Sequence, residues 1–151
     1  FTLPPQLFAT TFGVVATCGS AYVQLERVPA AAAVASVTVG LGAVAILLAN
    51  NVRDIDGDRL AGKRTLAVRL GRPRARALFT AVVAAMFASV ALLGLARPPV
   101  LVALAALPLA VVPVRLVRTR TDGPGLVAAL GATARLQLVL SLLLAAGLWL
   151  S

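Results

Sequence analysis

Long apolar runs, each close to 20 residues, most constrain how this chain can fold. About 20 consecutive apolar residues are needed for a helix to cross the hydrocarbon core of a bilayer, which is roughly 30 Å thick. Of the 151 residues, 60% are hydrophobic and 13% are charged, and the mean hydropathy is +0.98. A soluble domain of this length would lack the charged residues needed to cover its surface. The sequence therefore predicts an all-α, polytopic transmembrane bundle in a single domain over residues 1–151. The expected spans are about 6–25, 30–49, 77–96, 100–117 and 126–150.

Glycine and proline positions refine two of these spans. Gly40 and Gly42 lie in the second span, where small residues permit close helix packing. Pro108 and Pro113 lie in the fourth, and they predict a kinked or short helix because proline cannot donate a backbone hydrogen bond.

Positive charge is concentrated in two connections on the same side of the predicted bundle. Eight of the 14 basic residues lie between Arg53 and Arg76, and three lie between Arg115 and Arg120. Such crowding in alternate connections is typical of cytoplasmic loops, so the N-terminus is expected inside and the C-terminus outside a bacterial plasma membrane. Attraction to anionic lipid is also expected. Nucleic acid is not an expected partner, because no aromatic residues interleave the basic ones and no known binding module is present.

A polar segment from Asn50 to Gly71 follows the second span, and residues 50–76 are expected to form a cytoplasmic loop or helical hairpin. If the preceding helix continues, Asp54 and Asp58 stand one turn apart on one face. Two carboxylates so placed can share Mg²⁺, which prefers carboxylates together with substrate phosphates. Asn50 lies one turn earlier and adds a neutral oxygen, whereas Asp56 points away from the pair.

Basic residues follow the carboxylates at once. Arg59, Lys63 and Arg64 fit a phosphate ligand, since they can neutralise oxygens that the metal does not cover. Gly57 and Gly62 let the backbone bend so that carboxylates and cations converge. This pattern predicts a metal-bridged diphosphate site at the mouth of the bundle. On the spacing alone, a solvated, salt-bridged connector is the commoner explanation for such a segment.

The full order of residues resembles the second Asp-rich motif of the UbiA superfamily of intramembrane aromatic prenyltransferases. The shared features from Asn50 to Gly71 are NNxRDxxxDRxxGKxTLxVRLG. The string is most similar to the branch that acts on 1,4-dihydroxy-2-naphthoate. Tyr22, Gln24 and Arg135 also resemble that branch. The resemblance covers essentially the whole chain but only the C-terminal half of the family's length.

What the resemblance implies is a nine-helix bundle with two Asp-rich motifs facing each other across a cavity. Mg²⁺ would help an allylic polyprenyl diphosphate to lose diphosphate, and the aromatic ring would attack the resulting cation. In this branch, loss of CO₂ accompanies prenylation and gives a demethylmenaquinone, a step in menaquinone biosynthesis. The first Asp-rich motif is absent here and five spans are expected rather than nine. We therefore expect a fragment that is inactive alone and that needs the N-terminal half of the enzyme.

Spacing and resemblance together define the candidate site. The metal ligands are Asp54, Asp58 and Asn50; the catalytic residues are Asp54, Asp58, Arg59 and Lys63; and the substrate-binding residues are Asn50, Asn51, Arg53, Arg64, Tyr22, Gln24 and Arg135.

Three of these residues lie outside the motif, and each has a simpler alternative role. Tyr22 near the outer end of the first span is either an interfacial anchor or, with Gln24, part of the cavity lining. Arg135 lies inside the last span, where it either snorkels to the surface or faces the cavity and pairs with Asp56 or a substrate carboxylate.

Other function classes remain open at this point. A sister branch of the same superfamily could use 4-hydroxybenzoate, homogentisate or a tetrapyrrole as the acceptor. A cation transporter is a rival from a different class, but it would favour acidic residues at mid-membrane depth. A purely structural membrane subunit would require nothing of the motif.

Overall fold

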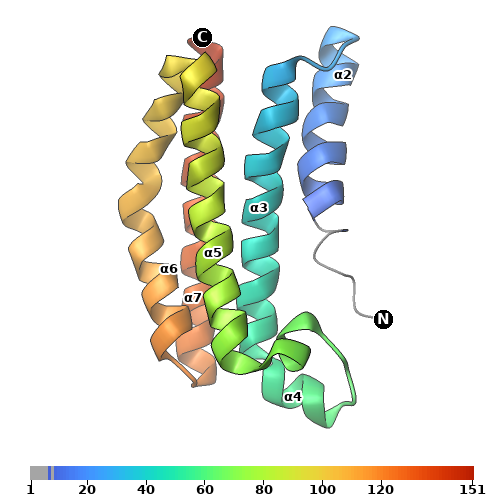
Figure 1. Cartoon of the computed structure of the whole chain (residues 1–151), viewed down its shortest axis with the longest axis vertical. Helices are drawn as coiled ribbons and strands as arrows, with labels where there is room; N and C mark the ends of the chain where they lie inside the picture. Colours follow the sequence, from blue (N-terminus) through green and yellow to red (C-terminus); the bar gives the residue numbers. More distant parts are fainter. Residues whose placement is uncertain (1–6, 8) are drawn as a thin grey trace.

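The computed structural model describes residue 7 and residues 9–151, and every regular element among them is helical. The first element of the described residues is the π-helix η1 and the last is the long α-helix α7 (Figure 1). The elements are η1 (Ala9–Cys18), α2 (Gly19–Leu25), α3 (Ala30–Arg53), α4 (Ile55–Leu60), α5 (Leu66–Ala96), η2 (Pro98–Ala106), α6 (Leu107–Thr119) and α7 (Gly123–Trp149).

Among the described residues, four helical segments are long and apolar enough to cross a membrane, which confirms the all-α polytopic class. They are Ala30–Arg53, Leu66–Ala96, Pro98–Thr119 and Gly123–Trp149, and they correspond to the last four predicted spans. The first predicted span is not among them, and its expected start at Gln6 lies outside the described residues. Its described part is divided between η1 and α2, which are 10 and 7 residues long. A fifth membrane crossing therefore stays a prediction.

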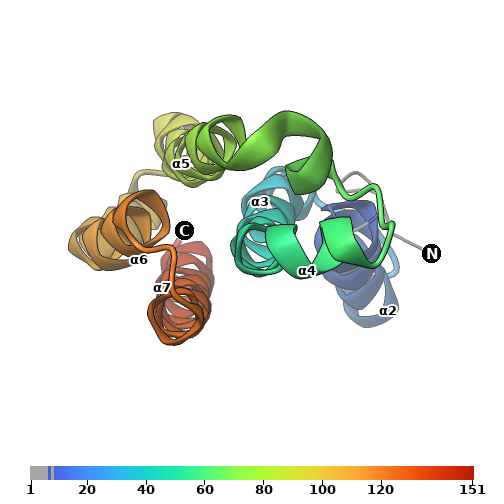
Figure 2. The same cartoon turned by 90° about the horizontal axis from the view of Figure 1, so that it is seen from below.

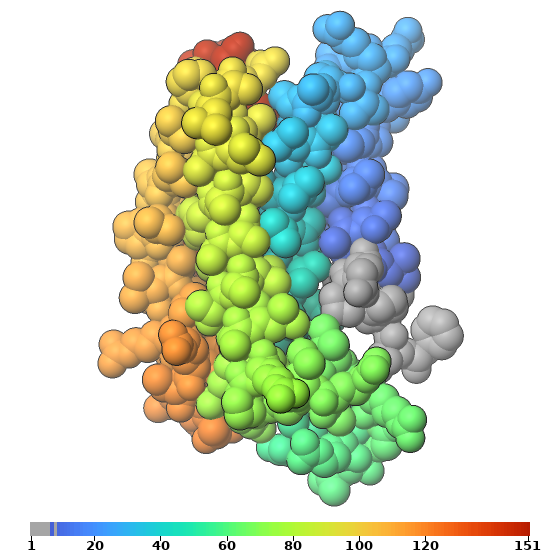
Figure 3. Space-filling view, in the orientation of Figure 1, coloured from blue at the N-terminus to red at the C-terminus, as the bar shows by residue number. Residues whose placement is uncertain are grey.

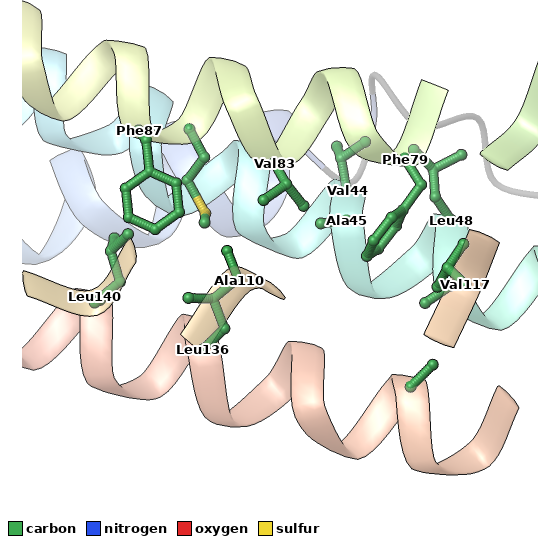
Figure 4. Close-up of a cluster of buried hydrophobic side chains, with 14 of the residues drawn as sticks. Val44, Ala45, Leu48, Phe79, Val83, Phe87, Ala110, Val117, Leu136 and Leu140 are labelled. Atoms are coloured by element: carbon green, nitrogen blue, oxygen red, sulfur yellow. The ribbon is translucent and has the colours of Figure 1, made fainter. Parts of the chain in front are cut away.

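Helix α3 occupies the centre of the bundle and contacts η1, α5 and α7 (Figures 1 and 2). Side chains from α3, α5, α6 and α7 point toward one another in the core shown in Figure 4. Phe79 and Phe87 of α5 are the large members, and alanines fill the narrow places. Between α3 and α5, the Thr38 and Ser89 hydroxyls are joined by a hydrogen bond of 2.8 Å. Such packing and polar contacts hold helices together in lipid, where burial from water contributes little.

Glycines set the closest approaches of the helices, as the sequence predicted for the second span. A Cβ on Gly40 of α3 would lie 2.9 Å from the carbonyl oxygen of Ala9 in η1. A Cβ on Gly42 would lie 1.5 Å from Oε1 of Gln137, whose amide donates a 3.4 Å hydrogen bond to the Val39 carbonyl. Close packing at both glycines is thus confirmed.

The segment over residues 50–76, expected as a loop or a helical hairpin, is mostly helical, which favours the second alternative and corrects the predicted helix boundaries. Helix α3 continues to Arg53, α4 follows one residue later, and α5 begins at Leu66 rather than near residue 77. An apolar run is expected to end where a helix leaves the hydrocarbon. The helix itself can continue into water, because its backbone groups form hydrogen bonds within the helix. The Thr65 hydroxyl caps α5 by accepting from the Val68 amide, and Gly71, with a φ of 76°, permits the kink that follows.

The fourth predicted span is irregular, as its prolines indicated. It begins within the 3₁₀-helix η2, Pro98–Ala106, and α6 continues from Leu107 with Pro108 in its first turn. Pro113 lies inside α6, so the run of backbone hydrogen bonds is interrupted there as well.

Candidate functional site

The motif lies at one end of the bundle, where α3 ends, α4 turns outward and α5 begins (Figure 1). Helix α3 stops at Arg53 because Asp54 adopts φ −92° and ψ 3°. Backbone hydrogen bonds nevertheless cross this break: the Asp54 amide donates to the Asn50 carbonyl at 3.1 Å, and the Asp58 amide donates to the Asp54 carbonyl at 2.7 Å. The helical spacing of Asn50, Asp54 and Asp58 therefore survives the change from α3 to α4.

Asp54 is held by the residue beside it. Its two carboxylate oxygens accept hydrogen bonds from Nε and one terminal nitrogen of Arg53, at 2.7 and 2.9 Å. Both side chains are about one third exposed, so a ligand can reach the pair. This bidentate guanidinium–carboxylate contact fixes the orientation of the Asp54 carboxylate.

Asp58 is the buried acid of the motif, with only 8% of its surface exposed. Its carboxylate lies 3.2 Å from Nζ of Lys63, and its carbonyl accepts from the Lys63 amide at 2.8 Å. The turn that returns Lys63 to Asp58 passes through Gly62, whose φ of 69° favours glycine. The structure thus brings together two residues that the sequence proposed for the same site.

The remaining basic residues of the motif are open to solvent. Arg59 and Arg64 are exposed, and neither forms an ion pair with a described residue. Asn50 and Asn51 at the end of α3 are half-buried. Two exposed guanidinium groups beside two carboxylates match the requirements of a metal-bridged diphosphate.

The donor set is compatible with Mg²⁺ but does not form a closed metal cage. Within residues 9–151, no group of three or more His, Cys, Asp or Glu side chains gathers at one place. Mg²⁺ usually takes one or two protein carboxylates and completes its shell with phosphate oxygens and water. Asp54 and Asp58 supply that number, so the residues present fit a metal that arrives with a diphosphate.

Arg72 is a motif-end residue that the sequence reasoning missed. Its guanidinium donates to the Asp56 carboxylate at 2.7 Å and to the Val52 carbonyl at 3.1 Å. The Arg72 side chain is 19% exposed, whereas that of Asp56 is 75% exposed. One arginine from α5 therefore ties α4 to the last turn of α3. Sequence spacing gave no signal for this contact, because 16 residues separate the two partners.

We predict that Arg72→Met loosens α4 while leaving α3 intact. Without the guanidinium, Asp56 loses its partner and the Val52 carbonyl loses a donor, so α4 opens more often. Hydrogen exchange of the Ile55–Leu60 amides should accelerate by about tenfold, the factor for a lost interaction of about 1.4 kcal/mol. Arg74→Met is the matched control, since Arg74 is exposed and lacks an ion-pair partner in the described chain. Equal exchange in both variants would show that Arg72 does not hold α4.

The three candidate residues outside the motif are not brought to it. Tyr22 and Gln24 lie on α2 and are exposed, with 59% of Tyr22 accessible, and this part of α2 lies at the opposite end of the bundle from α4 (Figure 1). Arg135 is exposed on α7, about 18 Å along the axis from Gly123. The proposed pairing of Arg135 with Asp56 is not observed, because Arg72 occupies that carboxylate. Roles for these three residues stay predictions.

Comparison with known proteins decides the family. The sequence model of the UbiA prenyltransferase family matches residues 1–129, well over half of the chain. This chain belongs to the UbiA prenyltransferase family. Its matched region includes α4 and the whole Asn50–Gly71 segment, so the earlier resemblance is confirmed.

Curated relatives point to one branch of the UbiA family. The chain is 39% identical over 137 residues to a 1,4-dihydroxy-2-naphthoate octaprenyltransferase of Mycobacterium tuberculosis, covering 91% of this chain and 47% of that protein. It is 37% identical over 140 residues to the Mycobacterium leprae protein of the same name, covering 93% and 48%. The Escherichia coli protein of that name is 45% identical over 65 residues, covering 43% and 21%. The chain thus spans about half the length of the mycobacterial relatives. No solved structure gives a significant match.

Proposed function

We propose that this UbiA-family chain takes part in Mg²⁺-dependent transfer of a polyprenyl group from an allylic diphosphate to 1,4-dihydroxy-2-naphthoate. Decarboxylation would accompany the transfer and give a demethylmenaquinone. The observation that carries the proposal is the end of α3, where Asp54 and Asp58 keep helical spacing beside basic side chains at the mouth of an apolar bundle. The names of the curated relatives support the acceptor.

The roles follow from the chemistry of the side chains. Asp54 and Asp58 are the proposed metal ligands, with Asn50 adding a neutral oxygen. Mg²⁺, when bound with the substrate, would neutralise charge on the departing diphosphate. Arg59 and Lys63 are the proposed diphosphate contacts, and Arg64, Asn51 and Arg53 are the proposed neighbours of the substrate. These eight polar residues occur within a stretch of 15 residues.

Binding of metal and diphosphate would change the ion-pair partners of Arg53 and Lys63. Arg53 and Lys63 now neutralise Asp54 and Asp58. A metal on the carboxylates would release both cations, because cations repel one another at short distance. The released guanidinium and ammonium groups are then available to phosphate oxygens in the same place. The site would therefore exchange its internal ion pairs for metal and diphosphate together.

The apolar bundle would protect the reaction from water. The four long apolar helices of the described residues provide a mostly apolar surrounding. A reactive allylic cation survives longer where water is excluded. A second set of metal ligands is proposed to come from the part of the enzyme that this chain does not supply, since the chain spans about half of its mycobacterial relatives. We expect the 151-residue chain alone to give no prenylated product, and product from it would contradict this.

The proposed orientation places the motif in the cytoplasm of a bacterial cell. Eleven of the 14 basic residues lie from Arg53 to Arg120, excluding Arg97, and all of them sit on helix ends or turns at the motif end. The three others are Arg27 and Arg97 at the opposite end and Arg135 within α7. This asymmetry favours a cytoplasmic motif in the plasma membrane.

The proposed acceptor is tested by offering several aromatic acids to membranes that contain the complete enzyme. Polyprenyl diphosphate and Mg²⁺ are supplied with 1,4-dihydroxy-2-naphthoate, 4-hydroxybenzoate or homogentisate. The prenylated products are then separated, identified and quantified by mass spectrometry. We expect product from the naphthoate and at least about 100-fold less from the others, as hydrogen-bonding sites discriminate strongly against mismatched ligands. Product from another acid alone would move the chain to a sister branch.

Arg135→Leu tests whether the exposed guanidinium of α7 meets the acceptor. An arginine within a membrane span needs a polar partner, and no described carboxylate pairs with Arg135. If it contacts the naphthoate carboxylate, the variant should raise the KM for the acceptor by about tenfold or more, since charged hydrogen bonds contribute about 1.5–3 kcal/mol. Arg27→Leu is the control at the far end of the bundle. An unchanged KM in Arg135→Leu would remove Arg135 from the site.

A further inference from the structure

The motif end of the bundle carries more positive charge than the proposed site uses. Each aspartate of this end is already neutralised by an internal ion pair: Asp54 with Arg53, Asp56 with Arg72, Asp58 with Lys63 and Asp122 with Arg120. Seven arginines of the same end make no ion pair within the described residues, namely Arg59, Arg64, Arg69, Arg74, Arg76, Arg115 and Arg118. This surplus needs anions from outside the chain.

The surplus divides into two places. Arg59 and Arg64 belong to the motif beside α4, where the substrate diphosphate is proposed to bind. Arg115 and Arg118 lie on α6, and Figure 2 shows α6 on the far side of α5 and α7 from α4. In Figure 3 the last turns of α6, in orange, and the motif segment, in green, share one end of the molecule but are apart. The α6 arginines therefore form a separate cationic surface.

The face of α6 that carries these arginines also has an apolar part. Arg115 and Arg118 are three residues apart, so they lie on one side of the helix, and both are exposed. Val111 and Val112 lie one turn closer to the middle of the bundle and are 64% and 53% exposed. Apolar side chains followed by two guanidinium groups match the acyl chains and then the headgroup of a phospholipid.

Arg76 of α5 adds a donor where α5 meets the end of α6, a junction called the seam below. Its guanidinium donates to the carbonyl of Arg120, just beyond the end of α6, and so joins α5 to the connection between α6 and α7. Its Nε is buried and has no acceptor in the described part of the chain. A buried N–H without a partner is unfavourable, and an anionic oxygen entering this seam would provide one. Asp122, the carboxylate of the connection between α6 and α7, already has partners: the Gly125 amide and Arg120 hold the pKa of its carboxyl below the usual range.

We propose that the seam between α5 and α6 at the motif end binds the phosphate of an anionic phospholipid. Arg115 and Arg118 would contact the headgroup, the buried Nε of Arg76 would donate to a phosphate oxygen, and the acyl chains would lie along Val111 and Val112. Basic seams between transmembrane helices on the cytoplasmic side are suited to such headgroups. The site is separate from Asp54 and Asp58 and does not depend on the proposed reaction.

The test compares two variants that lose the same charge at opposite ends. The double variant R115Q/R118Q removes the cations of the α6 surface, and R27Q/R97Q removes two arginines at the other end of the bundle. The complete enzyme is purified in mild detergent with phosphatidylglycerol or phosphatidylcholine, and retained lipid is measured by native mass spectrometry. Circular dichroism confirms that both variants keep their helices.

We expect phosphatidylglycerol to be retained by the wild type and by R27Q/R97Q and lost from R115Q/R118Q. Two arginines at an anionic surface correspond to about a 25-fold change in affinity if their contributions add. Arg76→Gln should reduce retention as well. Equal retention by the two double variants, or equal retention of phosphatidylcholine by the wild type, would overturn the proposal. Displacement of the lipid by millimolar inorganic phosphate would also overturn it and assign the seam to a free phosphate.

Discussion

Asp54→Asn and Asp58→Asn should each lower kcat/KM for prenyl transfer by about 100-fold or more, the scale on which a lost charge stabiliser affects a transition state. Each substitution keeps the size of the side chain and removes the charge that would hold Mg²⁺. The expected loss is larger at Asp58, because this acid is only 8% exposed and its amide replacement would face Lys63 without a counter-charge. The measurement is product formation in membranes at saturating Mg²⁺.

Asp56→Asn is the matched control for both variants. Asp56 lies between the two acids, loses the same charge on substitution and has a side chain that is 75% exposed. We expect activity within about threefold of the wild type, because an exposed ion pair contributes at most about 1 kcal/mol. A loss in Asp56→Asn as large as in Asp58→Asn would show that net charge, and not metal binding at two positions, is what the motif supplies. Full activity in Asp54→Asn and Asp58→Asn would show that the motif is a structural connection between helices and does not bind the metal.

Gly147→Ala is expected to have the largest effect on folding. A Cβ at this position of α7 would lie 2.7 Å from the Cα of Val100 and 2.8 Å from the carbonyl oxygen of Pro99, both of them backbone atoms of η2. The backbone of η2 cannot turn aside as a side chain would, so α7 and η2 must separate. Overpacking of this kind costs about 1–3 kcal/mol. Unfolding by denaturing detergent, followed by circular dichroism, measures the change.

Gly131→Ala on the same helix provides the comparison. No heavy atom lies within 4 Å of a Cβ at Gly131, so the added methyl group meets open space. Alanine favours a helix over glycine by about 1 kcal/mol, so Gly131→Ala should be neutral or stabilising. If both alanine variants unfold at the same detergent concentration, the close contact between α7 and η2 does not support the bundle.

The transmembrane helices could be predicted from the sequence because the bilayer demands long apolar runs. Residues 30–49 and 126–150 coincide with α3 and α7 to within a few residues. The start of α5 could not be predicted in this way, because the chain between Leu66 and Arg76 is polar and yet helical. The hydropathy of the sequence indicates which residues lie in lipid, whereas the helix boundaries depend on where the backbone is capped or broken. Thr65 caps α5 and Gly71 kinks it.

The candidate site was predictable only in its local part. The spacing of Asp54 and Asp58 follows from one helical turn, and the structure keeps that spacing across the break at Asp54. The return of Lys63 to Asp58 is also local, since five residues and one glycine turn separate them. The clamp of Arg72 on Asp56 was missed, because it depends on how α5 packs against α3, which no short pattern encodes.

The most direct test of the proposed function is the formation of prenylated naphthoquinol by membranes of the complete enzyme, with Mg²⁺ present, removed by a chelator and then restored. The substrates are 1,4-dihydroxy-2-naphthoate and an allylic polyprenyl diphosphate, and the product is identified by mass. We predict a product that has lost the carboxyl group, that disappears on chelation and that returns with Mg²⁺. This result would agree with Mg²⁺ binding by Asp54 and Asp58 at the junction of α3 and α4. Undiminished product in the chelator, or a product that retains the carboxyl group, would contradict this account.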